Sequence, residues 1–166
     1  MRREKEFIEN LQPTALNDPL TGLPNRNFFY RFAQERLAQA RIDKEQISVI
    51  SIDLDGFKQI NDAFGYSVGD HILMGIAQGL KKSLGNRGLL SRLGGDEFIV
   101  LLSPVRDVKE VESFVQHLLL ELYQPYAYQT WELFVTLSVG ISCYPGDGED
   151  IDTLIKQADS AMSHVK

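Results

Sequence analysis

The order of apolar and polar positions divides this chain into helices and strands. Apolar residues that recur at intervals of three and four lie on one face of a helix. This spacing is found in four stretches, at about 25–40, 68–82, 107–122 and 151–166. Two largely apolar runs instead predict strands, at 47–54 and at 131–143, the second with a possible pairing to 126–128. A short turn or helix is expected at 56–64.

A predicted hairpin over 88–102 separates the second helix from the third. Two apolar runs flank the segment Arg92-Leu93-Gly94-Gly95-Asp96-Glu97-Phe98, and a glycine-containing break between such runs is typical of a hairpin. The break carries Asp96 and Glu97 to the tip, where a pair of carboxylates can hold a hard cation and accept a proton. The alternative is that these two acids only make the turn soluble.

The predicted order of elements is helix, strand, helix, two-stranded hairpin, helix, strand, helix. This order favours an α+β fold in which helices pack on one side of an antiparallel-containing sheet. It resembles the ferredoxin-like palm, in which a strand and a neighbouring hairpin lie side by side. We expect a leading helix or linker over 1–16 and one domain over 17–166. The last helix reaches Lys166 without a glycine or asparagine stop signal, which predicts that the chain was cut from a longer protein.

Composition and charge narrow the class of protein. The 166 residues suffice for one domain, and 43% hydrophobic with 24% charged residues is typical of a soluble protein. No apolar run approaches a membrane span or a secretory signal, and Cys143 is the only cysteine, as expected in a reducing cytoplasm. A net charge of −6 argues against a nucleic-acid surface and leaves a small anionic ligand open. We therefore expect a cytoplasmic domain that contacts neither membrane nor nucleic acid.

A second acid lies inside the first apolar strand. Asp53 follows Ile52 in this run, and a carboxylate in a buried strand needs a partner. If the hairpin lies alongside, Asp53 and Asp96 meet, and carboxylate oxygens are the ligands that Mg²⁺ prefers. The alternative is an ion pair between Asp53 and a nearby lysine or arginine.

A phosphate-binding turn is predicted directly after this strand. The stretch Leu54-Asp55-Gly56-Phe57 can expose backbone N–H groups, and Lys58 adds a cation. The alternative for Lys58 is a solvated side chain on a short helix. Asp70 also has an alternative, because Ser67 and Asp70 have capping-box spacing.

Together these segments resemble the GGDEF domain of the diguanylate cyclase family. The resemblance covers about residue 17 to the end and rests on several motifs in order. They are Asp18-Pro19-Leu20-Thr21-Gly22-Leu23-Pro24-Asn25-Arg26, Asp53-Leu54-Asp55-Gly56-Phe57-Lys58, Asn61-Asp62 with Gly69-Asp70, Gly94-Gly95-Asp96-Glu97-Phe98, Thr136-Leu137-Ser138-Val139-Gly140-Ile141 and Ala158-Asp159-Ser160-Ala161-Met162. The implied fold is the palm of the nucleotidyl cyclases. The implied reaction condenses two GTP into cyclic di-GMP and releases two pyrophosphates, with one GTP on each domain of a facing homodimer.

The resemblance also implies roles for individual residues. Asp53, Asp96 and the carbonyl of Leu54 would bind Mg²⁺, with Mn²⁺ as a substitute, and Glu97 would belong to the same centre and help to deprotonate the attacking 3′-hydroxyl. Asn61 and Asp70 would hydrogen-bond guanine. The implied phosphate contacts are Lys58, Lys166 and the loop Asp55-Gly56-Phe57, with Gly94 and Gly95 allowing the nucleotide to approach the hairpin. The catalytic residues are thus expected to be Asp96, Glu97 and Lys58.

Some departures from the family pattern bear on function. Gly85-Asn86-Arg87-Gly88 occupies the place of the product-inhibition motif Arg-x-x-Asp, so that inhibitory site is expected to be absent. Tyr66 and Ser163 replace a usual histidine and tyrosine. The segments Leu23-Pro24-Asn25-Arg26 and Tyr144-Pro145-Gly146-Asp147-Gly148 look like those of GGDEF domains joined to a following EAL phosphodiesterase domain. Sensor domains, EAL domains or both are therefore expected to be linked to this domain in the full-length protein. A GTP-binding regulatory module without cyclase activity is therefore the second hypothesis, and a palm-like interaction domain that binds no nucleotide is the third.

Overall fold

The structure is a computed structural model that describes residues 16–165, with side chains described as far as residue 162. Within this part the helices are α2 (Arg26–Asp43), α3 (Phe57–Phe64), α4 (Tyr66–Leu84), α5 (Val108–Leu122) and α6 (Ile151–Val165). The strands are β1 (Gln46–Leu54), β2 (Gly88–Gly94), β3 (Glu97–Val105), β4 (Tyr126–Tyr128), β5 (Trp131–Leu133) and β6 (Leu137–Tyr144). The leading helix predicted over 1–16 and the site residue Lys166 lie outside the described residues, except for Leu16.

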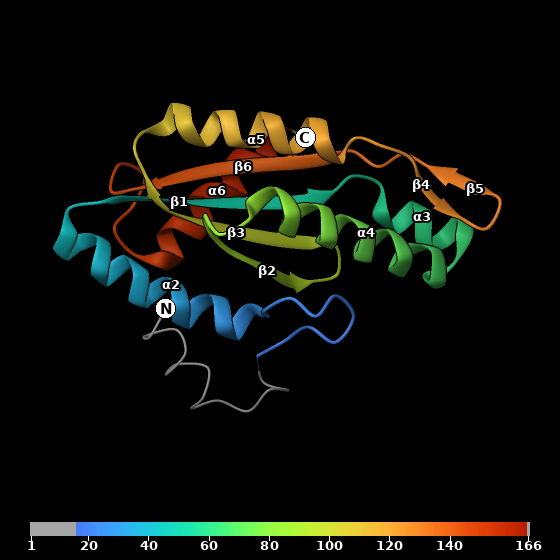
Figure 1. Ribbon diagram of the computed structural model, residues 1–166, viewed down its shortest axis with the longest axis horizontal. Coiled ribbons are helices and arrows are strands. Elements are labelled where there is room, and N and C mark those ends of the chain that lie inside the picture. Colours follow the sequence, from blue (N-terminus) through green and yellow to red (C-terminus); the bar gives the residue numbers. More distant parts are fainter. Residues whose placement is uncertain (1–15, 166) are drawn as a thin grey trace.

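A four-stranded sheet in the order β2-β3-β1-β6 forms the centre of the domain, and every neighbouring pair is antiparallel (Figure 1). The predicted α+β palm is confirmed. The central strand β1 and the hairpin β2–β3 lie side by side, as the sequence predicted. Because β1 has a partner on each side, its polar backbone groups are paired within the sheet while its side chains are buried.

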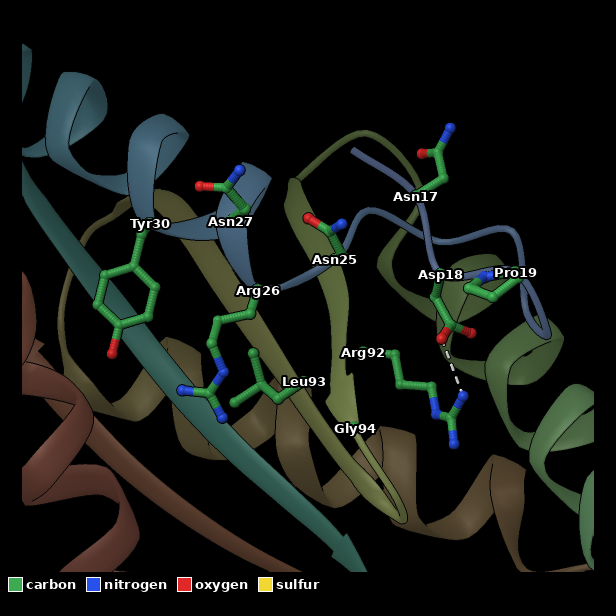
Figure 2. Close-up of a pocket in the computed structure, with 10 residues that line it drawn as sticks. All are labelled: Asn17, Asp18, Pro19, Asn25, Arg26, Asn27, Tyr30, Arg92, Leu93 and Gly94. Atoms are coloured by element: carbon green, nitrogen blue, oxygen red, sulfur yellow. Dashed lines mark hydrogen bonds and ion pairs between the residues drawn. The ribbon is translucent and has the colours of Figure 1, made fainter. Parts of the chain in front are cut away.

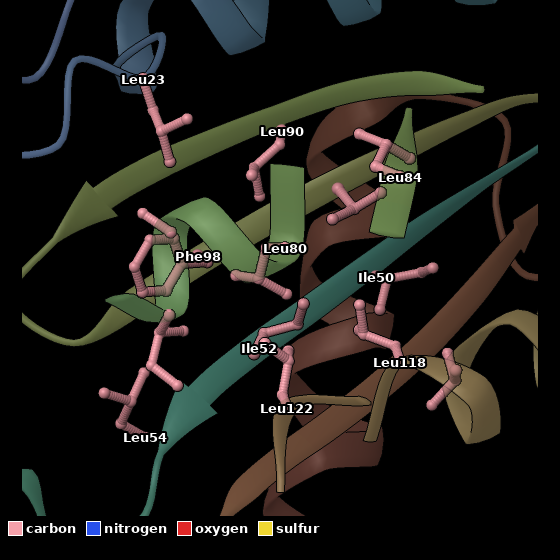
Figure 3. Close-up of a cluster of buried hydrophobic side chains, with 14 of the residues drawn as sticks. Leu23, Ile50, Ile52, Leu54, Leu80, Leu84, Leu90, Phe98, Leu118 and Leu122 are labelled. Carbon is pink, nitrogen blue, oxygen red and sulfur yellow. The ribbon is translucent and has the colours of Figure 1, made fainter. Parts of the chain in front are cut away.

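Helices cover both faces of the sheet, so the prediction that they pack on one side is wrong. Ile50 and Ile52 of β1 point into a core formed with α4 and α5 (Figure 3). Ile47 and Val49 point the other way, into a core formed with α2 and α6. Successive side chains of a strand face opposite sides, so a strand that is buried at nearly every position, as β1 is, requires cover on both faces. In Figure 1, α4 lies in front of the strands and α6 behind them.

The predicted strand over 131–143 is also wrong, because the chain forms two strands there. The short β5 pairs with β4 in a separate two-stranded sheet, whereas β6 pairs with β1. The break covers residues 134–136, and Thr136 is hydrogen-bonded to Asp55, just after β1, instead of extending a ladder. The apolar pattern alone did not reveal this change of sheet.

A side chain caps the start of α2, whereas no side chain caps the start of α4. Asn25 precedes α2, and its side-chain oxygen accepts a hydrogen bond from the backbone N–H of Phe28 at 3.1 Å. The alternative role of Ser67 and Asp70 as a capping box is wrong. α4 begins after Gly65, which has φ of +94°, and no side chain caps it. No helix within 16–165 is long and apolar enough to cross a membrane.

Candidate active site

The two acidic clusters meet at the end of β1. Asp53 is paired with Glu97 in the antiparallel register of β1 and β3, and directly paired residues carry their side chains on the same face. The backbone N–H of Leu54 donates to the carbonyl of Asp96 at 3.3 Å, which ties the hairpin turn to the end of β1. The turn itself depends on Gly94 and Gly95, whose φ values of +139° and +51° are unfavourable for other residues. The sheet thus brings together Asp53, Asp96 and Glu97.

Asp96 has an unusual protonation equilibrium. Its pKa is raised from 3.8 to about 6, first by burial, then by the hydrogen bond with and the negative charge of Asp53, and to a smaller extent by the charge of Glu97. A partly buried carboxylate beside another negative charge is harder to ionise, so Asp96 keeps its proton to a higher pH than an ordinary aspartate. A divalent cation in place of that proton would neutralise the pair.

The donor set fits such a cation. Asp53 and Asp96 supply carboxylate oxygens, the ligand type that Mg²⁺ prefers. Among residues 16–165, no three histidine, cysteine, aspartate or glutamate side chains are arranged as a complete metal site. Mg²⁺ is usually held by one or two carboxylates together with substrate phosphates and water, so a two-carboxylate site is consistent with it.

Arg92 is a residue of this site that the sequence reasoning quoted but did not single out. Its guanidinium forms an ion pair with Asp18 at 2.9 Å (Figure 2). Its Nε and one terminal nitrogen donate hydrogen bonds to the carbonyl of Gly95 at 3.1 and 2.7 Å. Burial would raise the pKa of Asp18, but hydrogen bonds from Thr21 and Arg92 outweigh it and lower that pKa. The N-terminal Asp18–Arg26 motif therefore holds the hairpin tip in place through Arg92.

A cavity of about 600 Å³ lies beside this ion pair, between the N-terminal motif, the first turn of α2 and the end of β2 (Figure 2). Arg26, Tyr30 and Leu93 line it together with Gly94. Gly94 is the only predicted site residue in its lining, which does not include the carboxylates Asp53 and Asp96. The cavity thus adjoins the hairpin at Gly94, and its lining includes none of the predicted metal ligands.

The predicted phosphate segment forms a strand-to-helix turn. Gly56 has φ of +70° and precedes α3, which has no side-chain cap. The first N–H groups of a helix have no partner within the helix, and such groups bind phosphate. Phe57 is buried and anchors the turn, whereas Lys58 is exposed at the first turn of α3. Asp55 differs from its neighbours, because its carboxylate is bonded to Thr136 and Ser138.

The predicted guanine contacts lie where α3 and α4 approach each other. A Cβ atom added to Gly69 would be 1.9 Å from Oδ1 of Asn61, so a larger residue there would displace the Asn61 side chain. Oδ1 of Asn61 is buried and has no hydrogen-bond partner among the described residues, an arrangement that is uncommon for a buried amide. Asp70 follows Gly69 and is exposed. Asn61 therefore lies on α3, one turn after Lys58, and Asp70 lies on the adjacent helix α4.

The fold and site define a palm-type domain with a carboxylate centre beside a strand-to-helix turn. The sequence profile of the family described as diguanylate cyclase, GGDEF domain, matches residues 15–166. The chain belongs to this family of enzymes. The solved GGDEF domain of TpbB, or YfiN, from Pseudomonas aeruginosa has a TM-score of 0.86 and 35% identity, covering 89% of this chain and 87% of that one.

Two relatives have chains much longer than this one. The chain is 36% identical to the bifunctional diguanylate cyclase/cyclic di-GMP phosphodiesterase MucR of Pseudomonas aeruginosa, over 99% of this chain and 23% of MucR. It is 34% identical to the cyclic di-GMP phosphodiesterase PdeR of Escherichia coli, over 98% of this chain and 24% of PdeR. The chain thus spans about a quarter of the length of these two relatives.

Proposed function

We propose that this domain condenses two GTP molecules into cyclic di-GMP in a reaction that depends on Mg²⁺, for which Mn²⁺ can substitute. The observation that supports this most directly is the convergence of Asp53, Asp96 and Glu97 at the end of β1. In each of two equivalent steps, a 3′-hydroxyl oxygen of one GTP attacks the α-phosphorus of the other. A phosphate ester bond forms, the bond to the leaving pyrophosphate breaks, and the hydroxyl proton passes to a base.

Different residues of this chain bind the cation and accept the proton. Asp53, Asp96 and the carbonyl of Leu54 hold the cation, which neutralises developing charge and lowers the pKa of the reacting hydroxyl when it is bound. Glu97 accepts the proton. Positioning supplies much of the remaining rate enhancement in phosphoryl transfer.

Nucleotide binding involves the surrounding elements. Asn61 and Asp70 hydrogen-bond guanine, and Lys58, Lys166 and the N–H groups at the start of α3 contact phosphates. Gly56 and Phe57 shape this turn, and Gly94 and Gly95 leave room beside the hairpin. Because one domain holds one GTP, the reaction requires a second copy whose site faces the first. We further propose that 17–166 is a cytoplasmic GGDEF unit linked to sensor or EAL domains in the full protein.

Product formation tests this proposal. The domain is incubated with GTP and Mg²⁺, and cyclic di-GMP is separated by chromatography. Glu97→Gln is expected to abolish turnover while retaining much of the GTP binding, and Glu112→Gln, which removes an exposed acid on α5, is the matched control. A Glu97→Gln variant with the wild-type rate would remove Glu97 from the mechanism.

The second candidate is a regulatory GTP-binding module that controls a neighbouring phosphodiesterase domain. Its support is the similarity to PdeR, whose name describes a phosphodiesterase. GTP binding that depends on Mg²⁺, with no product even from a forced dimer, would favour this function over the cyclase.

A further inference from the structure

The side chain and the backbone of Asp55 both form hydrogen bonds with the segment where β6 begins. The hydroxyl of Thr136 donates to Oδ2 of Asp55 at 2.7 Å, and the hydroxyl of Ser138 donates to Oδ1 at 2.5 Å. The backbone N–H of Asp55 donates to the carbonyl of Thr136 at 2.9 Å. Both carboxylate oxygens are therefore engaged with hydroxyl groups from one short segment.

The place of Asp55 in the chain makes this arrangement consequential. Asp55 directly precedes Gly56, which is the N-cap residue of α3 and provides no side-chain cap. Aspartate is among the preferred capping residues, because its oxygens accept hydrogen bonds from the first N–H groups of a helix. A released Asp55 carboxylate would compete with phosphate for those N–H groups and would add a negative charge beside it.

We propose that Thr136 and Ser138 are positioning residues that hold the Asp55 carboxylate toward β6. The N–H groups at the start of α3 are thereby kept open for the phosphates of GTP. This proposal rests on the proposed function, because it takes the start of α3 as the phosphate contact. It assigns a role to the segment Thr136-Leu137-Ser138, whose similarity to the family motif carries no role by itself. It also makes Asp55 a residue that shapes the phosphate turn without touching phosphate.

The test is a set of variants with opposing effects on GTP affinity. Thr136→Val combined with Ser138→Ala removes both hydroxyl groups with little change in size. The dissociation constant for GTP in the presence of Mg²⁺, measured by titration calorimetry, is expected to rise about tenfold. Adding Asp55→Ala to this double variant removes the released carboxylate. The triple variant is therefore expected to recover at least part of the affinity.

Thermal unfolding separates this positioning role from a purely structural one. Removing Asp55 restores no contact with β6, so the melting temperature of the triple variant is not expected to recover with the affinity. Thr130→Val with Ser113→Ala removes the same two hydroxyl groups from exposed positions and is the matched control. Thr136→Val alone changes an exposed residue and is expected to weaken binding in the same direction by a smaller factor.

Two results would overturn the proposal. The double variant could bind GTP with the wild-type dissociation constant, or the triple variant could bind no better than the double variant. Failure of the proposed function would look different, because the wild-type chain itself would then show no binding of GTP that depends on Mg²⁺, and this proposal would fall with it.

Discussion

Replacing Asp53 by asparagine is expected to stabilise the metal-free domain at neutral pH while preventing cation binding. Asparagine has nearly the same size as aspartate, removes one negative charge, and can donate a hydrogen bond to Asp96. In the wild type the pKa of Asp96 is raised from 3.8 to about 6, first by burial and then by Asp53. The substitution removes the second cause and leaves the first.

The magnitude follows from the pKa of Asp96. A rise from 3.8 to about 6 corresponds to roughly 3 kcal/mol if it is expressed in full. Burial accounts for the largest part, and Asp96 is only partly buried, so solvent screening reduces the effect further. We assign about 1 kcal/mol of free energy of unfolding to the repulsion from Asp53.

The direction of the pKa shift of Asp96 determines how the stability of the domain changes with pH. A carboxyl whose pKa is higher in the folded state contributes stability that is fully present below its unfolded pKa, 3.8, and is lost as pH rises through about 6. The metal-free wild type therefore loses stability from this group between about pH 4 and pH 7. Asp53→Asn loses less, so the difference in stability between the two proteins develops as pH rises toward about 6 and is fully present above it.

The assay is urea unfolding followed by circular dichroism in the presence of a chelator, at about pH 5 and about pH 7.5. Glu112→Gln, which removes an exposed charge, controls for the change in net charge. With GTP and Mg²⁺ added, the wild type is expected to gain stability and Asp53→Asn to gain little. A variant that is less stable than the wild type at the higher pH without metal would refute the reasoning.

Three further predictions concern other parts of the site. Arg92→Lys keeps the charge but loses the paired contacts with Asp18 and Gly95, so we expect the free energy of unfolding to fall by about 1–2 kcal/mol and turnover to slow. A variant with unchanged thermal stability and turnover would show that the Arg92 contacts are unimportant. Gly69→Ala places a Cβ atom 1.9 Å from Oδ1 of Asn61 and is expected to weaken GTP binding in calorimetry. Gln78→Ala, on the exposed side of α4, is the control and is not expected to change it. Equal GTP affinities of Gly69→Ala and the wild type would argue against a guanine contact at Asn61. Calorimetry with cyclic di-GMP is expected to show no tight binding outside the active site. Arg87 forms an ion pair with Glu110 at 3.7 Å and lies over the ring of Phe114, and Gly88 packs against Leu101. High-affinity binding of cyclic di-GMP outside the active site would contradict this prediction.

The sequence by itself determined the elements and the two acidic clusters. Helical spacing of apolar residues and a run rich in β-branched residues depend on short stretches of chain, so the helices, β1 and the hairpin were predictable. Asp53 stood out because a carboxylate in a buried strand needs a partner. Gly94 and Gly95 stood out because a tight turn requires their backbone freedom.

The tertiary structure alone decided which distant residues contact one another. The ion pair between Asp18 and Arg92 joins positions 74 apart, and the bonds from Asp55 to Thr136 and Ser138 join positions 81 and 83 apart. Local periodicity carries no information about such pairs, because they depend on strand order and on where β5 gives way to β6. The same limit explains why the helices on both faces of the sheet, and the break over residues 134–136, became visible only in the folded chain.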